Sequence, residues 1–231
     1  MDREEFVRAN QHSLAIESVM KRMKSPGQVT ETVVGPMVVT QYFTPGSGVK
    51  KSDVQKVNED IARALKVGSI RIVAVEGKQD ILIEVPRLNR RIVDLGELMQ
   101  SEAYTETGAE LPVILGRDTQ DEICVIDLAE CPHILMAGTT GSGKSVCLNS
   151  MLLSLIESGR SLKFIMIDPK IVELSIYDGI PHLIEDVVTK PEVAKETLEL
   201  AVSEMENRYE TFKNLNIRNI QSYHAKGKEL P

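Results

Sequence analysis

Three features that direct a chain to a membrane or to an oxidising compartment are missing from this sequence. No apolar run reaches the roughly eighteen residues that a membrane-spanning helix needs. The N-terminus, MDREEFVRAN, is charged where a signal peptide is apolar. The only cysteines are Cys124, Cys131 and Cys147, an odd number without CxxC spacing, which favours reduced thiols. We therefore expect a cytoplasmic chain with no membrane segment.

Metal clusters and broad DNA-coating surfaces are also not indicated. Cys131 lies two residues before His133, but no second ligand pair accompanies them, so no metal site is expected there. The formal net charge is −7, so any contact with DNA has to be local. The chain is 42% hydrophobic and 26% charged, which argues against disorder and fibres. This composition suits a soluble globular protein of one or two domains.

The first half of the chain alternates helix and strand signals. LAIESVMKRM carries apolar residues at helical spacing. Two short strands are predicted around Gly35-Pro36, and SIRIVAV and DILIEVP predict two more, with a turn at Gly77 to Asp80. These signals predict a small sheet with at least one covering helix.

A second helix is predicted between the two strand pairs. Ser52 followed by Gln55 has the spacing of a capping box, and Gly68 ends the helix. Its apolar stripe consists of Val54, Val57, Ile61 and Leu65. We predict that residues 1–107 form a small α+β domain, with the polar segment QSEAYTETGAELP at its boundary.

Residues 108–231 show the pattern of an α/β domain. Three strand-like runs, PVILG, EICVIDL and HILMAG, follow one another, and the third leads directly into GTTGSGKS. The next helix ends at Gly159. The order of strand, glycine-rich loop and helix is typical of a nucleotide-binding core.

Two further elements follow this helix. KFIMIDPK is an apolar run bounded by charge, which predicts a parallel strand buried on both faces. A long helix is predicted from Pro191 to Asn214, with Pro191 in its first turn. Its predicted buried stripe consists of Ala194, Leu198, Ala201, Met205, Tyr209 and Phe212.

The stretch GTTGSGKS has the spacing of a phosphate-binding loop. Crowded anionic phosphates require close backbone N–H groups, and glycines remove the side chains that would prevent this approach. Lys144 is then expected to reach the β- and γ-phosphates, and Ser145 to offer its hydroxyl to Mg²⁺. The sequence thus predicts ATP and Mg²⁺ as cofactors. The predicted nucleotide-binding residues are Gly138, Thr139, Thr140, Gly141, Ser142, Gly143, Lys144, Ser145 and Val146, with Lys144 and Ser145 in catalytic roles and Ser145 as metal ligand.

Hydrolysis needs a carboxylate near the metal ion and a group that orients the attacking water. Asp168 ends the apolar run FIMID, but Pro169 follows it where many ATPases have Glu. Asp168 is therefore either a metal ligand or a structural residue at a strand end, and both interpretations stay open. No other apolar strand ending in Asp-Glu follows before Pro231, so weak hydrolysis by this chain is expected.

The motifs of the second half resemble the motor domain of the FtsK/SpoIIIE family of bacterial double-stranded DNA translocases. The first half resembles the small alpha domain of the same family. The stretches that carry the resemblance are GPMVVTQYFTPGSGVK, DIARAL, VILGRDTQDEICVIDLAECPHILMAG, AGTTGSGKS, IDPK, IPHL and EMENRYETFKNLNIRNIQSYH.

The resemblance implies a ring-shaped, hexameric ATPase with a RecA-like core that threads duplex DNA in chromosome segregation and cell division. It places Asp168-Pro169-Lys170 on the second strand of that core. It also implies that the acidic metal-binding strand, the winged-helix domain and the membrane segments of the family lie outside this chain. The expected fold class is thus a P-loop NTPase core, incomplete at its C-terminal end, after a small α+β domain.

Two function classes remain open at this point. The chain is either part of a DNA-translocating ATPase or a non-hydrolysing nucleotide-binding and assembly module. A GTPase is disfavoured because TKPE, Thr189 to Glu192, lacks the Asp that reads guanine.

The basic run Pro86 to Arg91 and the pair Lys50-Lys51 either contact DNA phosphates or are solvated surface. His133 and His182 are expected to be structural.

Overall fold

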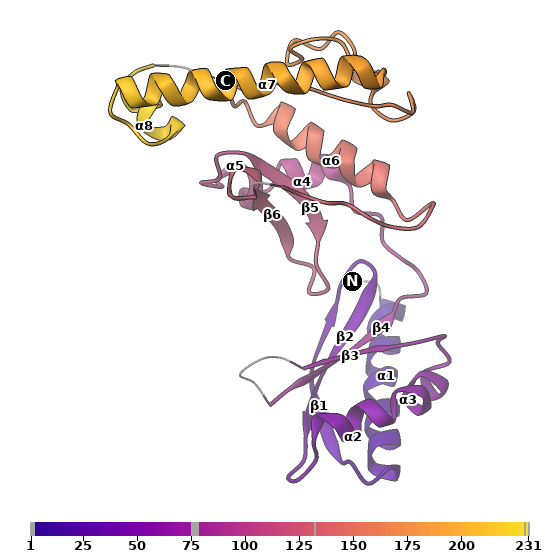
Figure 1. The fold of residues 1–231 in the computed structure, drawn as a ribbon. Coiled ribbons are helices and arrows are strands. Elements are labelled where there is room, and N and C mark those ends of the chain that lie inside the picture. Colours follow the sequence, from indigo (N-terminus) through magenta and orange to yellow (C-terminus); the bar gives the residue numbers. More distant parts are fainter. Residues whose placement is uncertain (1–2, 75–78, 132, 229, 231) are drawn as a thin grey trace. The chain divides into compact units, whose positions relative to one another are not determined.

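The computed structural model describes residues 3–74, 79–131, 133–228 and 230. The chain forms two compact units (Figure 1). The first consists of Met1–Thr107 and Ile114–Ile126, and the second of Gly108–Val113 and Asp127–Pro231.

The first unit is built on a four-stranded antiparallel sheet of order β1-β2-β4-β3. Its strands are β1 (Gly27–Val34), β2 (Val38–Pro45), β3 (Arg71–Ala74) and β4 (Ile81–Pro86). The four strands predicted from the sequence are confirmed. The predicted turn at Gly77 to Asp80 falls partly outside the described residues.

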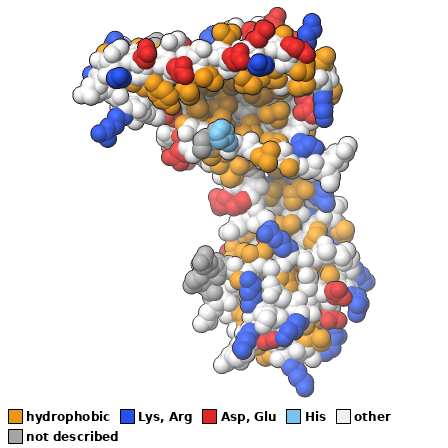
Figure 2. Space-filling view, in the orientation of Figure 1, with side chains coloured by type: hydrophobic (Ala, Val, Ile, Leu, Met, Phe, Trp, Pro, Cys, Tyr) orange, Lys and Arg blue, Asp and Glu red, His pale blue; other side chains and the backbone are white. Residues whose placement is uncertain are grey.

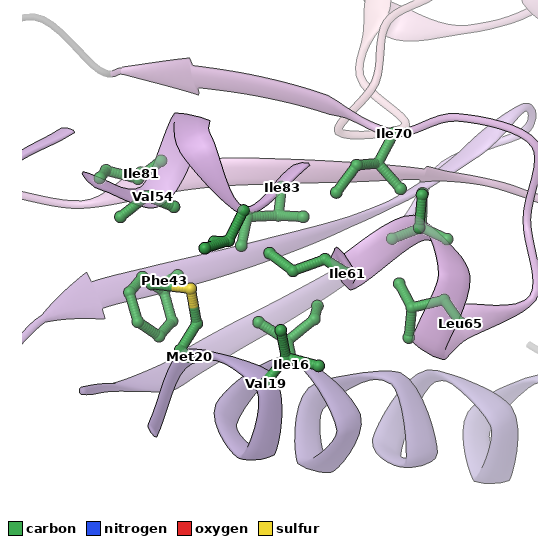
Figure 3. Close-up of a cluster of buried hydrophobic side chains, with 13 residues drawn as sticks. Ile16, Val19, Met20, Phe43, Val54, Ile61, Leu65, Ile70, Ile81 and Ile83 are labelled. Carbon is green, nitrogen blue, oxygen red and sulfur yellow. The ribbon is translucent and has the colours of Figure 1, made fainter. Parts of the chain in front are cut away.

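Three helices accompany this sheet: α1 (Arg3–Arg22), α2 (Lys51–Lys56) and α3 (Asn58–Leu65). α1 contacts both β1 and α3. Figure 3 shows the apolar side chains of the helices and the sheet meeting in one core. Its buried members are Ile16, Val19, Met20, Phe43, Val54, Val57, Ile61, Ala62, Leu65, Ile70, Ile81, Ile83 and Val85.

The predicted helix between the strand pairs is broken in two, although its apolar stripe is buried as predicted. The capping box expected at Ser52 and Gln55 is wrong. The N-cap is Lys50, two residues earlier, and the Asp53 carboxylate accepts a hydrogen bond from the backbone N–H of Lys50 at 3.1 Å. Lys66 ends α3 in a left-handed conformation, so the helix stops before Gly68.

The segment after β4 forms a smaller apolar cluster. It holds α4 (Leu95–Met99), α5 (Glu102–Thr105) and a two-stranded sheet of β5 (Pro112–Arg117) and β6 (Ile123–Asp127). The buried residues of this cluster are Leu98, Tyr104 and Ile114. The predicted strands PVILG and EICVIDL are thereby confirmed.

The helices in the described part of the second unit are α6 (Lys144–Glu157), α7 (Pro191–Asn214) and α8 (Ile220–His224). Two short 3₁₀ turns, η1 (Leu128–Glu130) and η2 (Ser175–Tyr177), lie between them. Its apolar core contains Met166, Tyr177 and Val187, against which Leu152 and Ile156 of α6 pack. Among the described residues, no helix combines the length and apolar character that a bilayer span requires.

The run KFIMIDPK pairs in parallel as predicted, but through two isolated bridges, and the predicted burial on both faces is wrong because only Met166 and Asp168 of the run are buried. Phe164 bridges Leu183 and Ile167 bridges Val188.

The strand predicted at HILMAG is wrong, because residues 133–138 pair with no strand in the described part of the chain. A strand requires a neighbour for its backbone hydrogen bonds. Without one, the Leu135 side chain stays 94% exposed.

α7 has the bounds predicted for it, but its predicted buried stripe is wrong. Leu198, Met205 and Tyr209 are 54%, 44% and 63% exposed, and Thr197 is the residue of α7 that is buried. Figure 2 shows hydrophobic side chains gathered along this helix. The period of the sequence identified the apolar face correctly, whereas burial also requires a packing partner for that face.

Candidate nucleotide-binding site

The glycine-rich loop, Gly138 to Ser145, is an exposed turn that ends at the first residues of α6. Gly141 and Gly143 adopt φ angles of +77° and +92°, which residues with a Cβ rarely adopt. Gly138 has no positive φ, and a Cβ there would lie 2.5 Å from Ser142 Oγ, so that the Ser142 side chain would have to rotate. The backbone conformation therefore accounts for Gly141 and Gly143, and close packing favours glycine at 138.

The Lys144 ammonium group supplies positive charge at the loop. Lys144 Nζ donates hydrogen bonds to the carbonyls of Gly138 at 3.0 Å and Thr139 at 3.4 Å. The first turn of α6 contains no acidic residue of its own, and the N-terminal end of the helix is the positive end of its dipole. A lysine, a helix N-terminus and a glycine turn at one point are suited to phosphate groups.

Ser145 contacts a carboxylate that the sequence did not single out. Its Oγ donates a hydrogen bond to Glu173 Oε1 at 2.6 Å. This distance is typical of a hydroxyl bonded to an ionised carboxylate. Glu173 lies five residues beyond Asp168, in the loop that follows the parallel-paired segment. The available signal was its position, since ligand sites gather at the carboxyl ends of parallel strands.

The Asp168 carboxylate bonds to the backbone that follows it in the sequence. Its carboxylate accepts hydrogen bonds from the backbone N–H groups of Lys170, Val172, Glu173 and Leu174, at 2.9–3.1 Å. These bonds, led by those from Glu173 and Leu174, lower the pKa of Asp168 to about 2. The side chain is only 8% exposed. The geometry therefore favours the structural interpretation of Asp168 over the metal-ligand interpretation.

Two arginines of the predicted basic run bond within the first unit. Arg87 donates to the carbonyl of Gly35 at 2.7 Å, and Arg91 pairs with Asp121. His133 is exposed, and the His182 ring lies 6.2 Å from that of Phe164. In the described ranges, no group of three His, Cys, Asp or Glu side chains is arranged to hold a metal ion.

The loop residues fit a nucleoside triphosphate with its metal ion. Each glycine leaves backbone that phosphate oxygens can approach, Lys144 supplies a cation, and Ser145 supplies a hydroxyl oxygen. Mg²⁺ is usually held by few protein oxygens together with phosphate oxygens, so this small donor set is sufficient.

Comparison with known proteins agrees with this geometry. Residues 94–231 match the model of the FtsK/SpoIIIE family, and residues 2–87 match the model of the FtsK alpha domain. The chain belongs to the FtsK/SpoIIIE family. The resemblance inferred from the sequence motifs is thus confirmed.

Several curated members of the FtsK/SpoIIIE family are similar over most of this chain. DNA translocase FtsK of Rickettsia bellii (strain RML369-C) is 45% identical over 205 residues, which is 88% of this chain and 27% of the relative. DNA translocase FtsK of Pasteurella multocida (strain Pm70) is 43% identical over 229 residues, which is 98% of this chain and 24% of the relative. The chain therefore spans about a quarter of the length of these relatives.

A solved structure supports the fold. The pCW3 conjugation coupling protein TcpA, in its monomer form with ATPgS, aligns with a TM-score of 0.50 and 22% identity. The alignment covers 95% of this chain and 62% of that chain. The predicted α/β fold class is thereby confirmed for the FtsK/SpoIIIE chain.

Proposed function

We propose that this chain is the ATP-binding part of a DNA translocase that couples ATP hydrolysis to movement along double-stranded DNA. The observation that carries the proposal is the loop geometry, in which Gly141 and Gly143 adopt positive φ angles and Lys144 lies over the loop carbonyls. Family membership and the names of the curated relatives support DNA as the partner. The corresponding setting is chromosome segregation and cell division, with this part of the protein in the cytoplasm.

The roles of the site residues follow from their chemistry. The backbone of Gly138 to Gly143 would surround the phosphates, with Thr139, Thr140, Ser142 and Val146 completing the site. Lys144 would exchange its carbonyl contacts for the β- and γ-phosphates, since an anion is a stronger acceptor for an ammonium group. Ser145 would offer its oxygen to Mg²⁺. When bound, the ion would neutralise negative charge on the phosphates during transfer to water.

The proposal includes assembly into a homo-oligomer, a hexamer in the intact motor. The exposed apolar side chains of α7 support it, because a long helix with an uncovered apolar face is typical of an interaction surface. Leu198, Val202, Met205 and Tyr209 lie on one face at spacings of three and four residues. We define these four residues as the α7 stripe.

Nucleotide binding and turnover together test the proposed function. The 231-residue chain is titrated with ATP and Mg²⁺ by calorimetry, and its phosphate release is measured with and without double-stranded DNA. Turnover that rises with DNA and disappears in Lys144→Ala supports the translocase. Binding without turnover under both conditions supports the non-hydrolysing assembly module. Absence of ATP binding contradicts both.

A further inference from the structure

We propose that the first unit contains a ligand site of its own, which binds a phosphate-bearing small molecule with an apolar or aromatic body. The site is a cavity of about 530 Å³, lined by residues of α1, the end of α3, β2 and the segment that follows β4. Ligand cavities in proteins commonly measure about 300–1,000 Å³, so this one has room for such a molecule. The proposal does not depend on nucleotide binding at the glycine-rich loop, none of whose residues lines the cavity.

The polar side chains of the cavity wall can all donate hydrogen bonds. Within the described part of the chain no Asp or Glu side chain lines the cavity, although the whole chain has a net charge of −7. Three of the lining groups are cationic, so an anion with several acceptor oxygens, such as a phosphate, is the complementary ligand. The polar lining residues are Arg8, Gln11, His12, Lys66, Arg87 and Asn89.

The three cations come from separate elements of the first unit. Arg8 lies on α1, and Lys66 is the left-handed residue that ends α3. Arg87 N donates to the carbonyl of Met37 at 3.0 Å, and Arg87 Nη1 donates to the carbonyl of Gly35 at 2.7 Å. These bonds restrict the position of the Arg87 guanidinium group. Folding of the unit thus brings together charges that are 21 or more residues apart in the sequence.

His12 gives an independent indication of a ligand. Its Nδ1 atom is buried and has no hydrogen-bond partner among the described residues. Burial, followed by the charge of Arg8, lowers the pKa of His12, so the ring is neutral at neutral pH. A buried polar atom without a partner is destabilising, and in native structures such an atom often marks the place of an ion or a water. A polar ligand that bonds to the ring removes this cost.

The rest of the cavity wall is apolar. Val39 and Leu65 are buried members of β2 and α3, and Leu88 adds a side chain that is 65% exposed. An inorganic ion leaves this surface uncovered, whereas an apolar or planar body attached to the phosphate removes it from water. A DNA duplex carries its phosphates on a rigid convex surface and does not enter a cavity of this size. The wall therefore favours a small molecule over the DNA backbone.

The test follows the His12 ring by nuclear magnetic resonance in the 231-residue chain. The chain has four histidines, and the His12 signal is the one that is absent from His12→Asn. Phenyl phosphate is the probe, and inorganic phosphate, phenol and a short DNA duplex are titrated in parallel. We expect a saturable shift with phenyl phosphate, an affinity about tenfold lower for inorganic phosphate, and no saturable shift with phenol.

Variants without one positive charge locate the anion. Arg8→Gln and Lys66→Gln should each weaken phenyl phosphate binding by about two- to fivefold, as expected for exposed charges. The matched controls are Arg22→Gln, on the same helix as Arg8, and Lys24→Gln. Lys24 is exposed with a φ of +57°, close to the +56° of Lys66, and neither control residue lines the cavity. Both controls should bind like the parent, and thermal melting verifies that each variant is folded.

Five outcomes contradict the proposal. The first is the absence of a saturable His12 shift with phenyl phosphate, and the second is parental affinity in both Arg8→Gln and Lys66→Gln. If phenol binds as tightly as phenyl phosphate, the cavity is an apolar site only. If the duplex shifts the His12 signal and phenyl phosphate does not, the phosphate belongs to DNA. A shift that disappears in Lys144→Ala shows that the probe acts through the glycine-rich loop.

Discussion

The Tyr177 hydroxyl donates to the Asn149 amide oxygen at 2.6 Å, one turn along α6 from the contact between Ser145 and Glu173. Burial raises the pKa of Tyr177, so its hydroxyl remains a neutral donor throughout the physiological range. The consequence concerns the nucleotide site. The loop after the parallel-paired segment and the helix after the glycine-rich loop are held together, which brings Glu173 to the start of α6.

Lys144→Ala should weaken ATP binding strongly. Hydrogen bonds to a charged group contribute about 1.5–3 kcal/mol each, which corresponds to a loss of about 10–150-fold in affinity if one is lost. Calorimetric titration with ATP and Mg²⁺ measures the change. The control, Lys195→Ala, removes an exposed lysine of α7 that pairs with Glu199. Equal affinities of Lys144→Ala and the parent would contradict the loop assignment.

Gly143→Ala should reduce ATP affinity by altering the backbone at the start of α6. A residue with a Cβ at a φ of +92° is destabilised by about 1–2 kcal/mol, so the native loop becomes about 5–30-fold less populated. Gly108→Ala is the matched control, because a Cβ there meets nothing within 4 Å and its φ is not positive. If both alanine variants bind ATP like the parent, the positive φ is not needed for binding.

Asp168→Asn should lower the melting temperature of the protein. It should also make the melting temperature less dependent on pH in the acid range. The folded pKa of Asp168 is depressed, so the stabilisation is complete above about pH 4 and is lost as pH falls toward 2. Thermal melting of parent and variant between pH 2 and 5 measures this difference. Asp186→Asn, which replaces an exposed carboxylate, serves as the control. A variant with the same steep acid limb as the parent would show that another group is responsible.

Charge on the α7 stripe should reduce self-association. Leu198→Glu combined with Met205→Glu places two carboxylates on the exposed apolar face, where burial between subunits becomes unfavourable. Size-exclusion chromatography with light scattering should show a shift toward the monomer. The control is Leu200→Glu, since Leu200 is also exposed but lies on the opposite face of the helix. An unchanged mass distribution for the double variant, or an equal shift for the control, would exclude the stripe as the interface.

Local sequence patterns determined much of this protein. The glycine-rich loop was recognisable because the spacing of Gly138, Gly141, Gly143, Lys144 and Ser145 is set by phosphate chemistry rather than by distant contacts. The bounds of α7 were predictable, since Pro191 at its start and a continuous helical period are local signals. The four strands of the antiparallel sheet, β1 to β4, followed from alternation and turn residues for the same reason.

Tertiary structure decided what local patterns could not. The apolar period of α7 identified a face, but whether that face is buried depends on a partner, and Leu198 is 54% exposed. The run HILMAG has strand-like composition, yet pairing is a property of two segments. The contacts of Asp168 and Glu173 are the clearest case. Both carboxylates follow one apolar run, and only the turn of the backbone directs Asp168 into its own N–H groups and Glu173 toward Ser145. Contacts across 28 residues of sequence are formed by folding and leave no periodic signal in the chain.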